Sequence, residues 1–240
     1  MDCSQDISVD ELRKVFQYCE AMGIEYLPFK ISMKMPAVKG AQAASKQQAL
    51  DELRSRIGEC SLCRLGDGRT NLVFGEGSPD ARIMFIGEAP GREEDKQGRP
   101  FVGEAGSVLT SLINKMGFAR EDVYIANICK CRPASNRDPM QDEMDACIKF
   151  IETQIRIIDP EVIVSMGKIA TYALMGRRDP IARFSISRVR GKFFEYITED
   201  KIIPVMPTFH PAYLMRNPRD KWLTWDDAQS VLKKIGMLKD

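Results

Sequence analysis

His210 is the only histidine in this 240-residue chain, and it lies in the proline-rich run Met206-Pro-Thr-Phe-His-Pro-Ala-Tyr-Leu-Met-Arg216. A run of similar character, Gly87-Glu-Ala-Pro-Gly91, lies far upstream. Each run follows a short apolar segment, residues 202–206 and 81–86, with the pattern of a buried strand. In an open parallel sheet, ligands bind at the loops that leave the carboxyl ends of strands. The two runs therefore predict a shared site, although a lone histidine is more often structural.

Four of the seven cysteines have a spacing that could hold a metal centre. They lie in three segments, namely a C-x2-C pair, a position just past a predicted strand and the next predicted helix: Cys60, Cys63, Cys131 and Cys147. Four thiolates suit either Zn²⁺ or an iron–sulfur cluster. The alternative is that Cys131 and Cys147 are small buried apolar residues, which is common for free cysteine. We assign that role to the other three, Cys3, Cys19 and Cys129.

Composition restricts the class of protein without identifying it. Charged residues make up 29% and hydrophobic residues 44% of the chain, which is ordinary for a globular protein. The formal net charge is +1, so the chain is not coated in positive charge, although a local basic face is compatible with this value. No apolar stretch reaches membrane-spanning length, and the first residues lack the pattern of a signal peptide. We therefore expect a cytoplasmic protein, in which cysteines serve metal or redox chemistry before disulfides.

Strand and helix patterns alternate along most of the chain. Strands are expected at residues 83–86, 123–126, 162–164 and 202–205, and helices at 46–57, 103–116, 139–158, 167–175 and 219–235, with a short ribbon at 188–197. This alternation predicts an α/β fold, a three-layer α/β/α sandwich around a mainly parallel four-stranded sheet.

The first 45 residues form a separate region in this interpretation. Apolar residues at helical spacing predict a helix at residues 8–23, and the irregular segment 31–45 has the composition of a linker. We therefore divide the chain into an N-terminal helical extension with its linker, residues 1–45, and a main domain, residues 46–240.

The main domain resembles a known family. From about Cys60 to Arg216 the chain is similar to the family 4 uracil-DNA glycosylases, the iron–sulfur branch of the uracil-DNA glycosylase superfamily. The similar stretches occur in the same order: Phe74-Gly-Glu-Gly, Gly87-Glu-Ala-Pro-Gly91, Glu94-Asp-Lys, Gly98-Arg-Pro-Phe-Val-Gly103, Asn127, Lys130-Cys-Arg-Pro133, Asn136-Arg137 and His210-Pro-Ala-Tyr-Leu214.

The resemblance implies an activity, a cofactor and a partner. It implies a monofunctional glycosylase that hydrolyses the N-glycosidic bond of deoxyuridine, releases free uracil and leaves an abasic site, thereby initiating base excision repair. The cysteine spacing resembles that of the family's cluster ligands, which favours a [4Fe–4S] cluster over zinc. The implied partner is uracil-containing DNA, single- or double-stranded, with no membrane involvement, and we expect a monomer. Two alternatives remain, a catalytically weak iron–sulfur DNA-binding protein of the same fold and a zinc-stapled nucleotide hydrolase.

Uracil recognition needs particular side chains, and the chain offers them. A flat apolar surface can stack on the base, and Phe101 fits that role. An amide can donate to uracil O4 and accept from N3–H, and Asn127 at the end of its strand fits this second role. The backbone of the Glu88-Ala89-Pro90 turn could add to the pocket. The alternatives are a core aromatic residue at 101 and a turn-former at 127.

Bond cleavage needs charge stabilisation. A donor near uracil O2 would stabilise the departing anion, and His210 is the candidate. A carboxylate near the sugar would favour the cation-like transition state and could orient water. The candidates are Glu88 and Glu94, with Asn136 as a helper. Another branch of the superfamily has an aspartate where this chain has Ala89, so water activation here must differ.

DNA distortion and DNA contact involve other residues. Leu214 resembles the family's wedge, which enters the base stack where the uracil has left it. A basic stretch could contact phosphates or could be a solvated surface: Arg177, Arg178, Arg183, Arg188, Arg190 and Lys192.

Overall fold

Four parallel strands form the centre of a six-stranded sheet in the computed structural model, which describes residues 45–176 and 180–238. The strand order is β1-β3-β2-β4-β6-β5. The four central strands are β3 (Tyr124–Asn127), β2 (Ile83–Gly87), β4 (Val162–Met166) and β6 (Ile202–Thr208). Two short antiparallel strands, β1 (Glu76–Gly77) and β5 (Phe194–Ile197), close the edges. The predicted count of four is therefore corrected to six, because β1 is too short to show a strand pattern and β5, within the predicted ribbon, pairs with β6 at the sheet edge.

The central strands are buried on both faces, as a parallel sheet between two helical layers requires. Every residue of β2, β3 and β4 is buried. Successive residues belong to different cores, since Met84 and Ile86 pack on one side of the sheet and Ile83 and Phe85 on the other. This alternation follows from the two-residue period of a strand.

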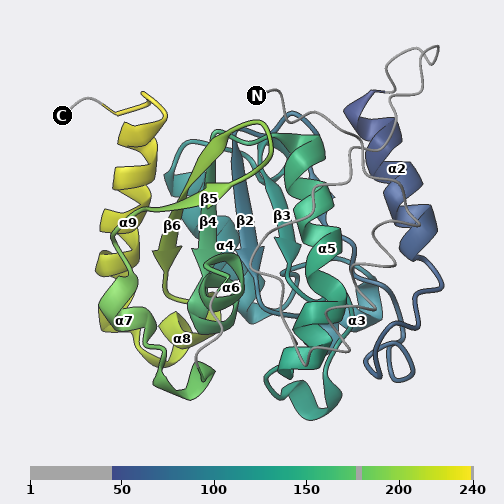
Figure 1. Cartoon of the computed structure of the whole chain (residues 1–240). Helices are drawn as coiled ribbons and strands as arrows, with labels where there is room; N and C mark the ends of the chain where they lie inside the picture. Colours follow the sequence, from purple (N-terminus) through teal and green to yellow (C-terminus); the bar gives the residue numbers. More distant parts are fainter. Residues whose placement is uncertain (1–44, 177–179, 239–240) are drawn as a thin grey trace, which may run out of the picture. The chain divides into compact units, whose positions relative to one another are not determined.

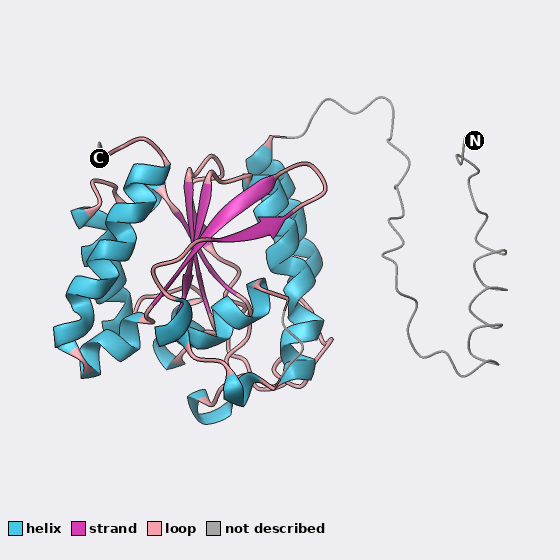
Figure 2. Cartoon of the chain, turned by 60° about the vertical axis from the view of Figure 1, so that its left-hand side comes forward, coloured by secondary structure: helices cyan, strands magenta, loops and turns pink. Residues whose placement is uncertain are grey.

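Five long helices form the outer layers (Figures 1 and 2). On one face α2 (Lys46–Ile57), α5 (Gln141–Ile158) and α6 (Gly167–Leu174) cover the core that contains Met84 and Ile86. On the other face α4 (Glu104–Lys115) and α9 (Lys221–Lys234) cover the second core. The predicted three-layer α/β/α sandwich is confirmed. The helix and most of the linker predicted in residues 1–45 lie outside the described residues.

Short helices occupy the loops at the carboxyl ends of the strands. They are α3 (Arg92–Gln97) after β2, the 3₁₀ turn Ala134–Asn136 after β3, α7 (Ile186–Val189) before β5 and α8 (Pro211–Arg216) after β6. In Figure 1 the parallel strands point downward, toward α3, α6 and α8. The ribbon predicted at residues 188–197 is instead the end of α7, a turn and β5. Among the described residues, no helix combines the length and apolar character needed to cross a membrane.

Candidate active site

The carboxyl ends of the parallel strands open into a cavity of about 830 Å³. The loops after β2, β3 and β6 and the start of α6 supply its walls. The lining residues include Glu88, Ala89, Pro90, Glu94, Phe101, Asn127, Asn136, Arg137, Asp138, Gly167, His210, Met215 and Arg216. Every catalytic and substrate-binding residue expected from the sequence therefore lines one cavity.

Asn127 and Phe101 form the floor of this cavity, next to Gly87. Asn127 is the last residue of β3 and pairs in register with Gly87 of β2. Asn127 is 2% exposed, yet its Oδ1 has no hydrogen-bond partner among the described residues. A Cβ at position 87 would collide with both Asn127 Oδ1 and Phe101 Cζ. The missing side chain of Gly87 therefore leaves room for an unpaired amide oxygen beside an aromatic ring.

Phe101 is held in a strained backbone conformation. Its φ is +50°, in the left-handed region, which costs a non-glycine residue about 1–3 kcal/mol. Two neighbours maintain this conformation. Glu94 Oε1 accepts hydrogen bonds from the N–H groups of Val102 and Gly103, at 3.0 and 3.1 Å. Gly106 lets the Phe101 carbonyl lie where a Cβ would otherwise be.

His210 lies beside this floor with its protonation state defined by local contacts. Its ring centroid is 5.7 Å from that of Phe101. Its Nδ1 accepts the Ala212 N–H at 3.2 Å, which places the ring hydrogen on Nε2. Burial, and then the nearby Arg216 charge, lower the pKa of His210 to about 4. His210 is therefore a neutral imidazole near pH 7, with Nε2–H as a donor. Gly167 allows its close approach, since a Cβ there would lie 2.9 Å from His210 Cβ.

Glu88 is the carboxyl group whose titration is most altered among the pocket residues. It directly follows β2 and is partly buried. Burial, and then the charge of Asp138, raise the pKa of Glu88 to about 7. A carboxyl group that changes charge near neutral pH is suited to acid–base or electrostatic catalysis. The adjacent Ala89 and Pro90 line the cavity as expected.

Glu94 and Asn136 have positions that favour supporting roles. The Glu94 carboxylate binds the backbone of the Phe101 loop, so it orients the aromatic ring. Asn136 is exposed at the rim with a φ of +54°, and its Oδ1 accepts from Arg132 Nε at 2.7 Å. Both line the cavity, but each has an oxygen already engaged by the protein.

The four expected ligand cysteines line a second, smaller pocket. Cys60 and Cys63 come from the loop after α2, Cys131 follows β3, and Cys147 lies on α5. The wall around them is apolar: Ile57, Leu62, Leu65, Leu72 and Phe150. No disulfide forms among the described cysteines. Within residues 45–176 and 180–238, no group of three or more His, Cys, Asp and Glu side chains is arranged to hold a single metal ion.

Hydrogen-bond donors point at two of these sulfurs. The Lys130 N–H lies 3.3 Å from Cys147 Sγ, and Arg69 Nη1 lies 3.3 Å from Cys131 Sγ. A hydrogen bond from Cys129, aided by the Lys130 charge, lowers the pKa of Cys147 to about 7, whereas burial raises the pKa of Cys63 and Cys131. Four thiols that line one pocket, an apolar wall and hydrogen-bond donors to sulfur fit the environment of a thiolate-ligated cluster. Cys129 itself is fully buried in the core, which agrees with its assigned apolar role.

Comparison with known proteins identifies the family. The profile of the uracil DNA glycosylase superfamily matches residues 74–230. The type-4 uracil-DNA glycosylase of Thermotoga maritima is 43% identical over 198 residues, which cover 80% of this chain and 99% of that protein. The chain belongs to the type-4 uracil-DNA glycosylases. The type-4 enzyme of Saccharolobus solfataricus is 44% identical over 187 residues, covering 78% of this chain and 86% of that protein. A type-5 uracil-DNA glycosylase of Thermus thermophilus is 32% identical over 118 residues, which cover 43% of this chain and 53% of that protein.

Leu214, the residue expected to act as a DNA wedge, is buried in this structure. Leu214 is 3% exposed, and it lies with Leu109 of α4 and Trp225 of α9 at an apolar groove. The sequence suggested a loop, whereas Leu214 lies on α8 with its side chain buried against the protein. Its neighbour Met215 is 38% exposed and lines the mouth of the active-site cavity.

The basic stretch is only partly available for phosphates. Arg190 Nε donates to Asp227 Oδ2 at 3.0 Å and its Nη2 donates to the Leu223 carbonyl, so Arg190 anchors its segment to α9. Arg183, Arg188 and Lys192 are exposed, whereas Arg177 and Arg178 lie outside the described residues.

Sequence patterns missed three residues that shape the site. Gly87 was part of a recognised motif, but its role depends on two side chains that meet over it in space. Met215 lies next to the residue that resembled a wedge. Glu143 has the appearance of an ordinary helical glutamate in the sequence, yet its side chain has no exposed surface. Helical periodicity around Cys147 was the one signal that could have placed Glu143 on the buried face of α5.

Proposed function

We propose that this chain excises uracil from DNA by hydrolysing the N-glycosidic bond of deoxyuridine, which leaves an abasic site and initiates base excision repair. The observation that carries the proposal is the buried, unpartnered Oδ1 of Asn127 in a cavity that Phe101 and His210 also line. A buried polar atom without a partner calls for a ligand that supplies one. The type-4 relatives, named as uracil-DNA glycosylases, support the same function.

Base recognition follows from the chemistry of the amide. Asn127 Oδ1 would accept the N3–H of uracil, and its Nδ2 would donate to O4. Cytosine presents an unprotonated N3 and an amino group at position 4, so both contacts would be lost. The Phe101 ring, held by the Glu94 anchor, would stack on the base.

Leaving-group stabilisation falls to His210. As the glycosidic bond breaks, uracil departs with the bonding electrons and negative charge develops on O2. The neutral imidazole can donate Nε2–H to this oxygen, because its Nδ1 is already an acceptor. A preorganised donor of this kind contributes about 10²–10³ in rate in other enzymes.

The sugar side of the reaction needs negative charge. In its carboxylate form Glu88 would stabilise the cation-like sugar and orient the attacking water. Its position directly after β2 supports this assignment over Glu94, whose Oε1 is engaged by the Phe101 loop. Asn136 would help at the rim.

The cysteine pocket would hold a [4Fe–4S] cluster through Cys60, Cys63, Cys131 and Cys147. When bound, such a cluster would connect the loop after α2, the segment after β3 and α5 by four bonds, which is a structural contribution. Uracil excision as described above takes place on protein side chains in a separate cavity. The alternative of a catalytically weak DNA-binding protein is not favoured, since Asn127, His210 and Glu88 line one cavity.

DNA containing uracil is the partner that this function implies. We propose that both single- and double-stranded DNA are substrates and that the chain acts as a monomer. Phosphate contacts would come from exposed basic residues near the cavity, among them Arg216.

The test is incubation of the purified chain with an oligonucleotide that contains one uracil, followed by alkali to cut abasic sites. We expect cleavage at the uracil position and one equivalent of free uracil, and no cleavage of the matched thymine oligonucleotide. Intact uracil oligonucleotide at molar excess of the protein would contradict the proposal.

A further inference from the structure

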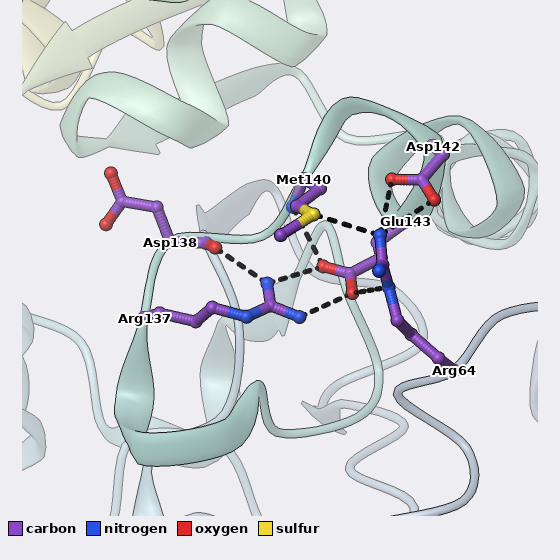
Figure 3. A network of polar contacts seen from close by, with 6 residues as sticks. All are labelled: Arg64, Arg137, Asp138, Met140, Asp142 and Glu143. Atoms are coloured by element: carbon purple, nitrogen blue, oxygen red, sulfur yellow. Dashed lines mark hydrogen bonds and ion pairs between the residues drawn. The ribbon is translucent and has the colours of Figure 1, made fainter.

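Glu143 lies at the centre of a polar network between the two pockets (Figure 3). It occupies the first turn of α5, four residues before Cys147, and its side chain is 0% exposed. Four donors satisfy its carboxylate. Oε1 accepts from Arg64 Nε at 2.9 Å and Arg137 Nη2 at 2.6 Å, and Oε2 accepts from Arg137 Nη1 and the Met140 N–H, both at 2.8 Å.

The two arginines belong to different functional segments. Arg64 directly follows Cys63 in the cysteine loop, and it also donates to Asp142 and to the Met140 sulfur. Arg64 does not line the active-site cavity. Arg137 does line it, and its Nη1 donates to the Asp138 carbonyl. Figure 3 shows Glu143 between the two guanidinium groups, which approach it from opposite sides.

Arg137 supports the rim of the active-site cavity, residues 135–138, whose backbone is strained. Ser135 and Asn136, which precede it, have φ values of +55° and +54°. Non-glycine residues keep such conformations only where the surroundings impose them. The rim is also close enough to the catalytic residues for the Asp138 charge to raise the pKa of Glu88. A rim displaced from this position would change the environment of Glu88.

We propose that Glu143 is a positioning residue that joins the cysteine loop to the rim of the uracil pocket, so that Arg64 affects uracil excision without contacting the substrate. The inference rests on the proposed function, and it adds that the cysteine loop influences the uracil pocket through Glu143. The bidentate contact fixes Arg137, and Arg64 holds the second side of Glu143 Oε1. If the cysteine loop moves, Glu143 loses a donor and the Arg137 rim loses its fixed support.

The experiment measures single-turnover excision from a single-stranded uracil oligonucleotide, which requires no unstacking of a duplex. Maximal rate and half-saturating protein concentration are determined for the wild type, Arg64→Ala, Glu143→Gln and the double variant, each with its iron content per chain. Glutamine keeps the shape of Glu143, but its NH₂ group would face the N–H donors of Arg64, Arg137 or Met140. Arg82→Ala is the matched control, because Arg82 forms an exposed ion pair with Glu161 at the opposite end of β2.

We expect Arg64→Ala to lower the maximal rate about fivefold to tenfold, with the half-saturating concentration within about twofold of wild type and iron content unchanged, as for a positioning effect on the catalytic step. Adding Arg64→Ala to Glu143→Gln should cause no further loss, since both act through one network. Arg82→Ala should match the wild type.

Three results would overturn the inference: a wild-type rate for Arg64→Ala, losses that multiply in the double variant, or loss of iron in Arg64→Ala, which would place the effect on the cysteine loop itself. If Glu143→Gln does not fold, Arg64→Lys is measured in its place. This variant should recover part of the rate that Arg64→Ala loses, because lysine again offers Glu143 a hydrogen-bond donor. A rate equal to that of Arg64→Ala would contradict the network. Absence of excision by the wild type would instead refute the proposed function.

Discussion

Gly87 shows how one missing side chain creates a binding site. Asn127 at the end of β3 and Phe101 from the loop before α4 meet over Gly87, where a Cβ would collide with both. Glycine at this strand end leaves room for the unpaired amide oxygen of Asn127, a residue that lines the cavity. The pocket is therefore preorganised in the absence of base, at the expense of a strained Phe101.

Substitution of this glycine tests the geometry at its smallest scale. Gly87→Ala should lower uracil excision by at least about 10²-fold, because the methyl group displaces the Asn127 amide and the Phe101 ring from productive positions. Single-turnover rates measure the effect on excision, and a thermal melt measures the effect on stability. Gly117→Ala is a control for a glycine with open space around it, although its φ of +89° makes some loss of stability expected there too. A Gly87→Ala protein with wild-type excision would contradict the described pocket.

The titration of Glu88 predicts a pH dependence. Because the pKa of Glu88 is raised to about 7, the group is a neutral acid below that pH and a carboxylate above it. Only the carboxylate stabilises a cation-like sugar, so the single-turnover rate should rise with pH through a midpoint near 7. His210, whose pKa is lowered to about 4, stays neutral over this range and adds no opposing limb.

Two variants distinguish Glu88 from other groups in that profile. Glu88→Gln should lower the rate by about 10²-fold and remove the rise. Asp138→Asn removes the like charge, so it should move the midpoint to lower pH while keeping the rise. A rise that persists unchanged in Glu88→Gln would assign the titration to another group.

At the scale of elements, α8 decides which side chain meets the DNA. The helix places successive residues about 100° apart, so Leu214 and Met215 point in different directions. Leu214 faces the groove between α4 and α9, and Met215 faces the cavity mouth. The exposed methionine is therefore the residue suited to fill the space left by a flipped base.

Two truncations separate packing from DNA distortion. Met215→Ala should slow excision from a U·A duplex about tenfold or more, while single-stranded rates stay within about twofold, because unstacking costs a few kcal/mol only in the duplex. Leu214→Ala should instead lower the free energy of unfolding by about 2–3 kcal/mol, with similar rates per folded molecule on both substrates. A duplex-specific loss in Leu214→Ala, with none in Met215→Ala, would restore the original wedge assignment.

The same helices show what a sequence can and cannot predict. Long amphipathic helices and apolar strands were placed to within a few residues; α2 was predicted with the bounds that the structure gives it. The short helices α3 and α8 were missed because six residues are too few to show a period, and proline runs resemble loops. The burial of Leu214 was not predicted for that reason, since it depends on helical geometry. The edge strand β1 has only two residues and gives no pattern.

The pocket residues were recognisable from motifs, but their protonation states and long-range contacts were not. The lowered pKa of His210 depends on burial and on the Arg216 charge, and its tautomer depends on the Ala212 N–H. The raised pKa of Glu88 depends on burial and on the charge of Asp138, 50 residues away in sequence. The network of Glu143 likewise joins residues 79 positions apart. Such contacts follow from the complete fold rather than from local spacing.

At the scale of the whole molecule, the cysteine pocket joins segments that the sheet alone does not hold together. Anaerobically purified protein should be brown and contain about four irons per chain, as a cubane with four thiolate ligands requires. Cys147→Ala should reduce iron content and soluble yield, whereas Cys19→Ala should leave both unchanged. Metal analysis and visible absorbance give the answer, and stoichiometric zinc without iron would contradict the cluster assignment.

The most direct test of the central claim is base release by variants of Asn127. Free uracil and free cytosine released from matched oligonucleotides are quantified by mass spectrometry for the wild type, Asn127→Asp and Asn127→Ala. We expect uracil alone from the wild type, and at least about 10²-fold less uracil from both variants. Asn127→Asp should shift its selectivity toward cytosine, because a carboxylate accepts from the cytosine amino group. Wild-type uracil release by both variants would contradict the account, because the unpaired amide oxygen of Asn127 would then have no role in reading the base.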